Sequence, residues 1–293
     1  METWADRPRV VLLDAVAQIL TEGVCRWAGL PLPDDGTGPL TADLVAMVDG
    51  FATPGPRHWR ARLARRRRET WIAAIVDQVR SGTAGLPPDC VVERVALHRD
   101  LDGDLLASRV AAVEVLNIIR PTVAVCWFMV FVAHALHRWP DTRTKLAGGD
   151  AQYTRAFVQE IRRFYPFAPF VGGTAATDLF YQGEPIPEGT MVLLDLYGQN
   201  HDPDLWKDPY EFRPERFLRH PGDVDQLIPQ GGGDPATGHR CPGEAVVIGL
   251  LEALSQRLAL LDYTLPSQDL SIPLGRMIAR PRSGFVIEAV HRV

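Results

Sequence analysis

The chain has 293 residues, of which 46% are hydrophobic, enough to fill one large core or two ordinary ones. Its 36 acidic and 31 basic residues give a formal net charge of -5, which favours neither nucleic acid nor an acidic molecule as a bulk partner. No secretory signal is recognisable among the first residues, and the four cysteines are widely spaced. We therefore expect a globular protein of a reducing, cytoplasmic compartment.

Helical spacing of apolar residues predicts helices over about residues 8–27, 41–50 and 55–82. The third helix is expected to place Trp59, Leu63 and Ile72 on its apolar side. It also carries seven arginines between Arg57 and Arg68. Two interpretations are open for these arginines, a patch that binds anions or nucleic acid and a solvent-exposed face. The acidic net charge favours the exposed face.

Residues 105–137 are predicted as a long helix that is apolar nearly all round, as expected for an element buried in the middle of a fold. Its most apolar run, residues 123–135, is shorter than the roughly 20 residues of a bilayer span, so we expect no transmembrane helix. Arg120 and Pro121 interrupt this pattern with a permanent charge and a missing hydrogen bond. Either Arg120 forms a buried ion pair with a carboxylate such as Glu114, or it binds the carboxylate of a ligand.

An amphipathic helix over about residues 150–165 brings Glu160 and Arg163 to one side. The following residues, about 170–200, alternate in short runs broken by Gly and Pro, which predicts a small β-meander. Strands are few elsewhere. The expected fold class is therefore mainly α with a small β-meander.

Residues 230–244 read QGGGDPATGHRCPGE and place Cys241 just before a helix predicted over residues 244–261. Unpaired N–H groups and the helix dipole favour an anion at that position, so Cys241 should form a thiolate readily. Such a thiolate serves as a nucleophile, a redox thiol or a metal ligand. The alternative is an ordinary loop cysteine beside a helix cap.

Three short motifs, EIRR at residues 160–163, FRPERF at residues 212–217 and GHRCPGE at residues 238–244, occur in the order and at the separations seen in the cytochromes P450. The chain thus resembles these haem-thiolate oxygenases. The resemblance implies a single haem-thiolate oxygenase domain with the cytochrome P450 fold over residues 1–293. It also implies haem b as cofactor, with Cys241 as the metal ligand whose electron density promotes O–O cleavage.

The same resemblance implies roles for the residues around the cysteine. Glu160, Arg163 and Arg216 correspond to a structural triad that ties a helix to a loop. His239 or Arg240, beside the ligand, is expected to meet a haem propionate. These are cofactor-binding and structural roles, with no part in the chemistry.

The distal helix of most cytochromes P450 carries an acid followed by an alcohol, whereas Arg120-Pro121 precedes Thr122 here. This feature, with RRFYPFAPFVGG at residues 162–173, is similar to the bacterial fatty-acid peroxygenases, which hydroxylate the α or β carbon or form terminal alkenes by decarboxylation. The similarity implies a catalytic site at Arg120 and Pro121, where Arg120 binds the carboxylate of a long-chain fatty acid. That carboxylate would act as the acid–base group for hydrogen peroxide, so that no redox partner protein is required.

The tail pocket is expected to include Phe167, Phe170 and Val171, although aromatic residues after a helix are equally typical of a core. Fewer residues precede Arg120 than in a complete family member, so the N-terminal portion of the fold is expected to be absent. Two other functions stay open. One is a dioxygen-dependent monooxygenase with redox partners, and the other is a non-catalytic remnant that binds haem poorly.

Overall fold

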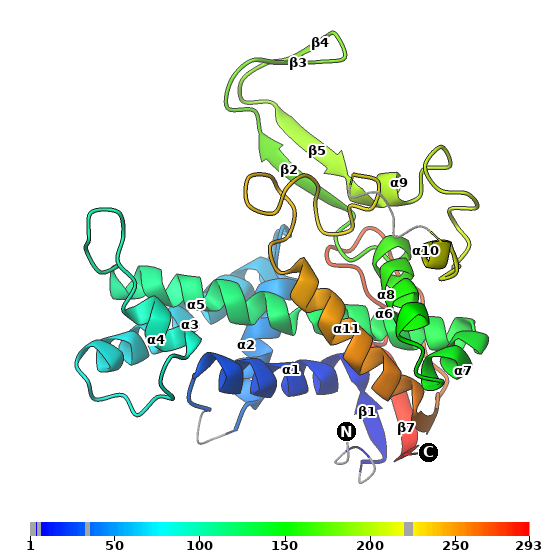
Figure 1. Cartoon of the computed structure of the whole chain (residues 1–293), viewed down its shortest axis with the longest axis horizontal. Coiled ribbons are helices and arrows are strands. Elements are labelled where there is room, and N and C mark those ends of the chain that lie inside the picture. The colour runs from blue at the N-terminus through cyan, green and yellow to red at the C-terminus, as the bar shows by residue number, and fades with distance from the viewer. Residues whose placement is uncertain (1–3, 5–6, 33–35, 220–224, 293) are drawn as a thin grey trace. The chain divides into compact units, whose positions relative to one another are not determined.

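The computed structural model describes residue 4 and residues 7–32, 36–219 and 225–292 (Figure 1). The chain divides into two compact units, and each is considered by itself. Unit 1 comprises Met1–His134, Leu260–Ser271 and Pro281–Val293, and unit 2 comprises Ala135–Ala259 and Ile272–Arg280. The predicted mainly helical fold with small sheets is confirmed.

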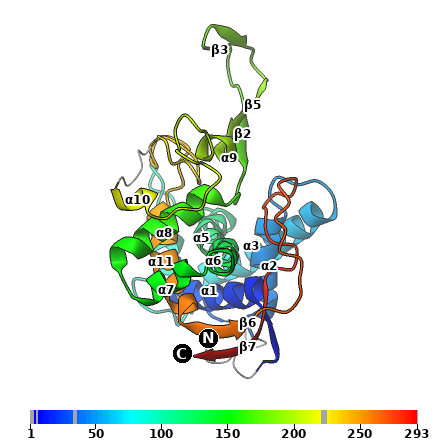
Figure 2. The same ribbon diagram turned by 90° about the vertical axis from the view of Figure 1, so that its right-hand side faces the viewer.

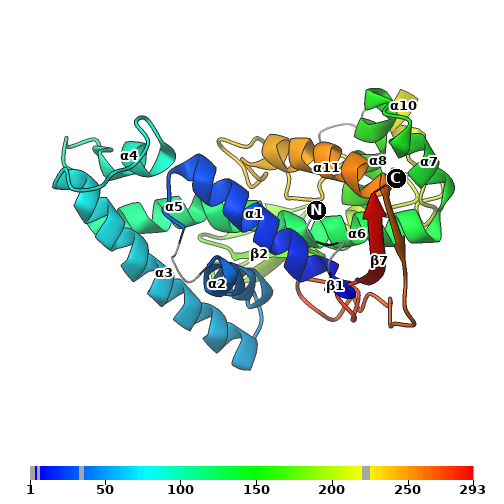
Figure 3. The same cartoon turned by 90° about the horizontal axis from the view of Figure 1, so that it is seen from below.

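Unit 1 contains the first five helices, which are α1 (Leu12–Ala28), α2 (Gly38–Asp49), α3 (Pro56–Arg80), α4 (Val91–Ala96) and α5 (Ser108–Val123). Helix α1 ends where predicted, because Gly29 adopts φ 80° and donates its N–H to the carbonyl groups of Cys25 and Arg26. Helices α1, α2 and α3 all contact α5, and α2 also packs against α3 (Figure 3).

The arginines of α3 face a set of buried carboxylates. Arg67 and Arg68 both pair with Asp43 of α2, and Arg60 pairs with Asp49 at the end of that helix. Both ends of the arginine-rich run are therefore paired with carboxylates of α2. The expectation for Trp59 and Leu63 was wrong, since they are 64% and 56% exposed. Small residues occupy the buried side at this end of α3, namely Ala61 and Ala64.

Helix α5 is followed by α6 (Val125–Arg138), with a single break at Ala124, three residues after Pro121. Together, Ser108–Arg138 form a helical stretch long and apolar enough to cross a membrane. However, 67% of its most apolar window is buried within the structure, which is typical of the core helix of a globular protein.

A three-stranded antiparallel sheet in unit 1 has the order β1-β7-β6. Figure 2 shows β6 beside β7. Strand β1 (Arg9–Val11) pairs with β7 (Val286–Arg292), which also pairs with β6 (Leu261–Thr264). The predicted helices over residues 8–27 and 244–261 were therefore too long by these strand residues. The apolar run of β1 continues directly into α1, so local periodicity does not separate them.

Unit 2 contains α7 (Asp141–Ala147), α8 (Ala151–Phe164), α9 (Leu196–Asn200), α10 (Arg216–Arg219) and α11 (Glu244–Ala259). Helix α8 is central, because it contacts α7, α9, α10 and α11. Asp150 caps α8 by accepting hydrogen bonds from the N–H groups of Gln152 and Tyr153. Tyr153, Phe157 and Ile161 are buried on one face, as expected for the predicted amphipathic helix.

The strands of unit 2 form one nested hairpin in place of the expected meander (Figure 1). Strand β2 (Phe170–Thr174) pairs with β5 (Met191–Asp195), and β3 (Leu179–Tyr181) pairs with β4 (Glu184–Ile186). Gln182 and Gly183 have φ values of 50° and 87°, as a two-residue hairpin turn requires. The chain therefore reverses once, so each run pairs with its counterpart across this turn.

Candidate functional site

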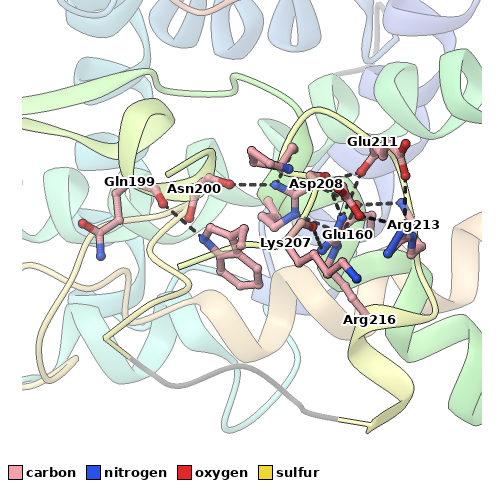
Figure 4. Close-up of polar contacts among 11 residues, drawn as sticks. Glu160, Gln199, Asn200, Lys207, Asp208, Glu211, Arg213 and Arg216 are labelled. Carbon is pink, nitrogen blue, oxygen red and sulfur yellow. Dashed lines mark hydrogen bonds and ion pairs between the residues drawn. The ribbon is translucent and has the colours of Figure 1, made fainter. Parts of the chain in front are cut away.

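Glu160 of α8 lies at the centre of a buried ionic cluster (Figure 4). Its carboxylate has no solvent exposure and accepts hydrogen bonds from Nε and Nη2 of Arg163, both at 2.8 Å. Arg216 Nε lies 3.2 Å from Oε1 and 3.1 Å from Oε2 of Glu160. The backbone N–H of Arg213 adds a bond of 2.8 Å. The structure therefore brings Glu160, Arg163 and Arg216 together.

The two guanidinium groups extend this cluster to backbone carbonyl groups of the following loop (Figure 4). Arg163 Nη1 donates to Asn200 O at 2.7 Å and to Pro209 O at 2.9 Å, and Arg216 Nη1 donates to Lys207 O at 2.9 Å. Arg163 also lies over the ring of Trp206, 5.4 Å from its centroid. One carboxylate and two arginines thereby fix the loop over residues 200–216 against α8.

Cys241 is half-buried and lies at the end of a tightly closed loop before α11. Its N–H donates to Gln230 O at 3.0 Å, and the His239 N–H donates to Gly232 O at 3.2 Å. Gly231 has φ 93°, and a Cβ atom there would overlap the carbonyl oxygen of His239. The glycine-rich start of the loop is therefore needed for the close approach of its two ends.

Arg162, the residue before Arg163, reaches this loop from α8. It is 1% exposed and donates to Gln230 Oε1 at 3.1 Å and to Gln159 Oε1 at 2.5 Å. It also pairs with Glu244, the first residue of α11. Burial lowers the pKa of Arg162, while the charges of Glu244 and Cys241 oppose that effect.

Glu244 is shared between two guanidinium groups. Besides Arg162, it accepts hydrogen bonds from Arg240 Nε at 2.5 Å and Arg240 Nη2 at 2.9 Å. Burial acts to raise the pKa of Glu244, but the hydrogen bond from Arg240 and the charge of Arg162 outweigh it and hold the pKa below its ordinary value. Arg240 is thus engaged with Glu244, whereas His239 is exposed.

Arg162, Gln230 and Glu244 were not among the residues that the sequence singled out. Two consecutive arginines in α8 and an acid directly after the Cys-Pro-Gly step were the available signals. Neither signal says which side chains meet, because the loop and α8 are far apart in sequence.

Arg120 lies in α5 of unit 1 and is half-buried. Burial lowers the pKa of its guanidinium group, and repulsion from Arg65 lowers it further. Glu114, the expected partner, is exposed and instead accepts a hydrogen bond from Asn117 Nδ2 at 3.5 Å. Within the described residues no carboxylate forms an ion pair with Arg120, so the alternative of a buried pair with Glu114 was wrong.

The side chains around Arg120 and in the expected tail pocket have mixed exposure. Thr122 donates its hydroxyl to Ile118 O at 2.9 Å, within the helix that contains Pro121. Phe170 in β2 is 41% exposed, and Phe167 and Val171 are half-buried. None of these three residues belongs to the fully buried core.

Comparison with known proteins gives one family and a consistent group of structures. The Cytochrome P450 family matches residues 149–247. Cytochrome P450SP alpha (CYP152B1), solved in complex with (R)-ibuprofen, is 44% identical with a TM-score of 0.93, covering 99% of this chain and 72% of that one. P450EX alpha (CYP152N1) with myristic acid is 39% identical with a TM-score of 0.91, covering 98% and 70%.

A variant of cytochrome P450 OleT, solved with arachidonic acid, is 35% identical with a TM-score of 0.92, covering 100% of this chain and 70% of that one. Among curated proteins, Cytochrome P450 78A6 of Arabidopsis thaliana is 28% identical over 204 residues, which is 59% of this chain. Protopine 6-monooxygenase of Papaver somniferum is 29% identical over 155 residues, or 46% of this chain. The aligned parts are 37% and 28% of those relatives' lengths, so the chain spans about a third of each.

Proposed function

Because this chain belongs to the cytochrome P450 family, in the branch of the solved CYP152 proteins, we propose that it is a haem-thiolate peroxygenase. It hydroxylates long-chain fatty acids at the α or β carbon, or decarboxylates them, with hydrogen peroxide as oxidant. A single haem-thiolate oxygenase domain and a cytoplasmic location are part of this proposal. Four cysteines without a disulfide, all in the described part of the chain, support the reducing compartment.

The residues around Cys241 fit a haem b iron. A haem would supply four nitrogen ligands of its own, so the single sulfur of Cys241 would be enough to hold its iron. Cys241 is half-buried at a helix start, and the positive charge of Arg162 acts on it. Within the described residues no group of three or more His, Cys, Asp or Glu side chains could hold a bare metal ion. When bound, the haem supplies oxidation of carbon by activated oxygen.

The proposed substrate class rests mainly on the environment of Arg120. A guanidinium group in the most apolar helical stretch of the chain, without an ion-pair partner among the described residues, favours binding of an anion. The compounds named with the solved relatives, arachidonic acid, myristic acid and (R)-ibuprofen, all bear a carboxyl group. Arg120 therefore binds the carboxylate of the fatty acid, and Pro121 belongs to the same catalytic site.

The bound carboxylate then acts as the acid–base group that the helix lacks. It moves a proton from one oxygen of hydrogen peroxide to the other, so that the O–O bond breaks with water as the leaving group. In hydroxylation, the other oxygen atom of the peroxide becomes the hydroxyl oxygen of the product. Because Arg120 fixes the carboxylate, only the neighbouring carbons are presented for attack. Phe167, Phe170 and Val171 contact the fatty-acid tail, and His239 or Arg240 contacts a haem propionate.

A dioxygen-dependent monooxygenase is the second candidate. Its support is that some curated relatives, such as protopine 6-monooxygenase, are named as monooxygenases. Thr122 offers a hydroxyl group, but the preceding residues are Arg120 and Pro121 and include no acid. Turnover that needs a reductase and does not respond to peroxide would select this candidate.

The test compares Arg120→Ala with Arg109→Ala in purified, haem-loaded protein. Arg109 lies on the same helix but is exposed and pairs with Glu69. We expect Arg120→Ala to abolish peroxide-driven turnover of a long-chain fatty acid without changing the haem spectrum, and Arg109→Ala to retain it. Unchanged turnover in Arg120→Ala would refute the carboxylate-binding role. If the wild-type chain shows no thiolate-type band in its reduced, carbon-monoxide-bound spectrum, the chain is a remnant that does not hold haem properly.

A further inference from the structure

Helix α8 carries two consecutive arginines that serve different parts of unit 2. Arg163 turns to Glu160 and the loop carbonyl groups, as described above. Arg162 turns to the cysteine loop, where it donates to the side chains of Gln230 and Glu244, and it also donates to Gln159 within α8. A guanidinium group that is 1% exposed depends on such acceptors, because water does not replace them.

Two of these acceptors also hold Cys241 through their backbone groups. The carbonyl oxygen of Gln230 accepts the Cys241 N–H at 3.0 Å, and the Glu244 N–H donates to the Cys241 carbonyl oxygen at 3.2 Å. Gln230 begins the loop and Glu244 ends it. One buried side chain is therefore bonded to both residues that flank and hold the cysteine.

Three charged side chains contact one another in this cluster. Arg162 and Arg240 are cationic, and Glu244 is the carboxylate that both contact. Since Arg162 and Glu244 are nearly buried, solvent screens their charges little. The ion pair that joins α8 to the end of the cysteine loop is therefore shielded from solvent.

We infer that Arg162 is a positioning residue for Cys241. Arg162 binds Gln230 and Glu244 at once and so fixes the loop that carries the sulfur atom. This inference rests on the proposed function only in that Cys241 is taken as the haem ligand. Arg162 touches neither substrate nor reacting atoms in this role. It acts through the conformation of residues 230–244.

The first experiment measures hydrogen exchange of the Cys241 amide in the full chain without haem. Arg162→Gln removes the bonds to Gln230 and Glu244 together, and Gln230→Met removes one of them at similar side-chain volume. The matched control is Arg155→Gln, on the same helix, whose ion pair with Glu252 of α11 is exposed. We expect exchange at Cys241 to be about tenfold or more faster in Arg162→Gln, intermediate in Gln230→Met and unchanged in the control.

This pattern also separates positioning from global unfolding. If Arg162→Gln simply destabilised unit 2, amides throughout α8 and α11 would exchange faster as well. The inference requires that the increase be confined to the loop over residues 230–244. Exchange at Cys241 equal to that of Arg155→Gln would overturn it, as would an increase spread evenly over the unit.

The second experiment reads the thiolate band of the reduced, carbon-monoxide-bound haem protein. Arg162→Gln should lose much of this band in favour of the form without thiolate ligation, and Arg162→Lys should recover part of it. The double variant Arg162→Gln/Glu244→Gln restores the net charge of the cluster without its hydrogen bonds. We expect the double variant to remain impaired, and full recovery would overturn positioning in favour of charge alone.

The two experiments fail independently. If the wild-type chain has no thiolate band, the proposed function is wrong, but exchange in the haem-free chain still decides whether Arg162 fixes the loop. If the band is present and Arg162→Gln behaves as Arg155→Gln does in both measurements, the proposed function stands and the role of Arg162 is refuted.

Discussion

Replacing Glu160 with glutamine should destabilise unit 2 strongly, because both carboxylate oxygens face donors. Oε1 accepts from Arg163, Arg213 and Arg216, and Oε2 accepts from Arg163 and lies 3.1 Å from Arg216 Nε. Whichever way the new amide turns, its NH₂ group meets N–H groups. The buried guanidinium of Arg163 also loses its counter-charge. Removing one partner of a buried ion pair costs about 3–5 kcal/mol.

The assay is urea denaturation followed by far-ultraviolet circular dichroism. At a slope of about 3 kcal/mol per M, this loss lowers the midpoint by about 1 to 1.7 M. Glu215→Gln is the matched control, since it makes the same chemical change in the exposed Lys145–Glu215 pair. That pair should contribute no more than about 1 kcal/mol. The protein should remain folded in both variants, because domain stabilities are typically about 5–15 kcal/mol.

A midpoint of Glu160→Gln within the error of Glu215→Gln would refute the reasoning. It would mean that the five contacts to this carboxylate are replaced by other acceptors, and that the cluster does not fix the loop over residues 200–216. An intermediate value, near 2 kcal/mol, would indicate that the amide retains the contact to Arg163 and loses only Arg216.

Three further predictions concern the pH dependence of stability and two glycines. His201 is buried beside Tyr197 and Tyr210, and burial lowers its pKa from 6.5 to about 4. The unfolded chain therefore binds this proton more tightly than the folded chain does. The contribution of His201 to stability is complete above pH 6.5, and about 3 kcal/mol is lost as the pH drops to about 4. Urea midpoints of His201→Phe should not show this loss between pH 6.5 and about 4, and the same pH dependence in the variant and the wild type would contradict the prediction. Gly231→Ala should disrupt the cysteine loop and remove the thiolate band, because the added Cβ overlaps His239 O. Gly249→Ala, in α11 with open space around it, should instead raise stability by about 0.5–1 kcal/mol in the same denaturation assay, and a loss of stability would contradict it.

The features that the sequence predicted correctly are those encoded locally. Helix α8 has a capping aspartate, a clear apolar face and a proline just beyond its end, so its bounds were nearly right. The end of α1 at Gly29 follows from the need for a left-handed residue. The motif around Cys241 identified the family because glycine, cysteine and proline are restrictive residues at fixed spacing.

The features that sequence could not predict depend on distant partners. Strand β1 is three residues long and becomes a strand only because β7, near the other end of the chain, pairs with it. Trp59 and Leu63 fit a helical apolar side, but Ala61, Ala64 and the arginine–aspartate pairs form the contact with α2 instead. For Arg162, helical spacing gives the direction of the side chain relative to Arg163, but the loop that receives it lies some 70 residues further along the chain.

The sheet of unit 1 can form only late during synthesis, because two of its strands are far apart in the sequence. Strand β1 leaves the ribosome early, but its partner β7 is made much later, after roughly 15 to 55 s at about 5–20 residues per second. In the sequence, the helices of unit 2 come after α5 and before β6, so they have been made before β7 is. A nascent chain that has just finished α11 thus has all the helices named above, α1 to α11. The residues of β1 still expose unpaired backbone groups at that stage, and these can pair with a strand of another chain.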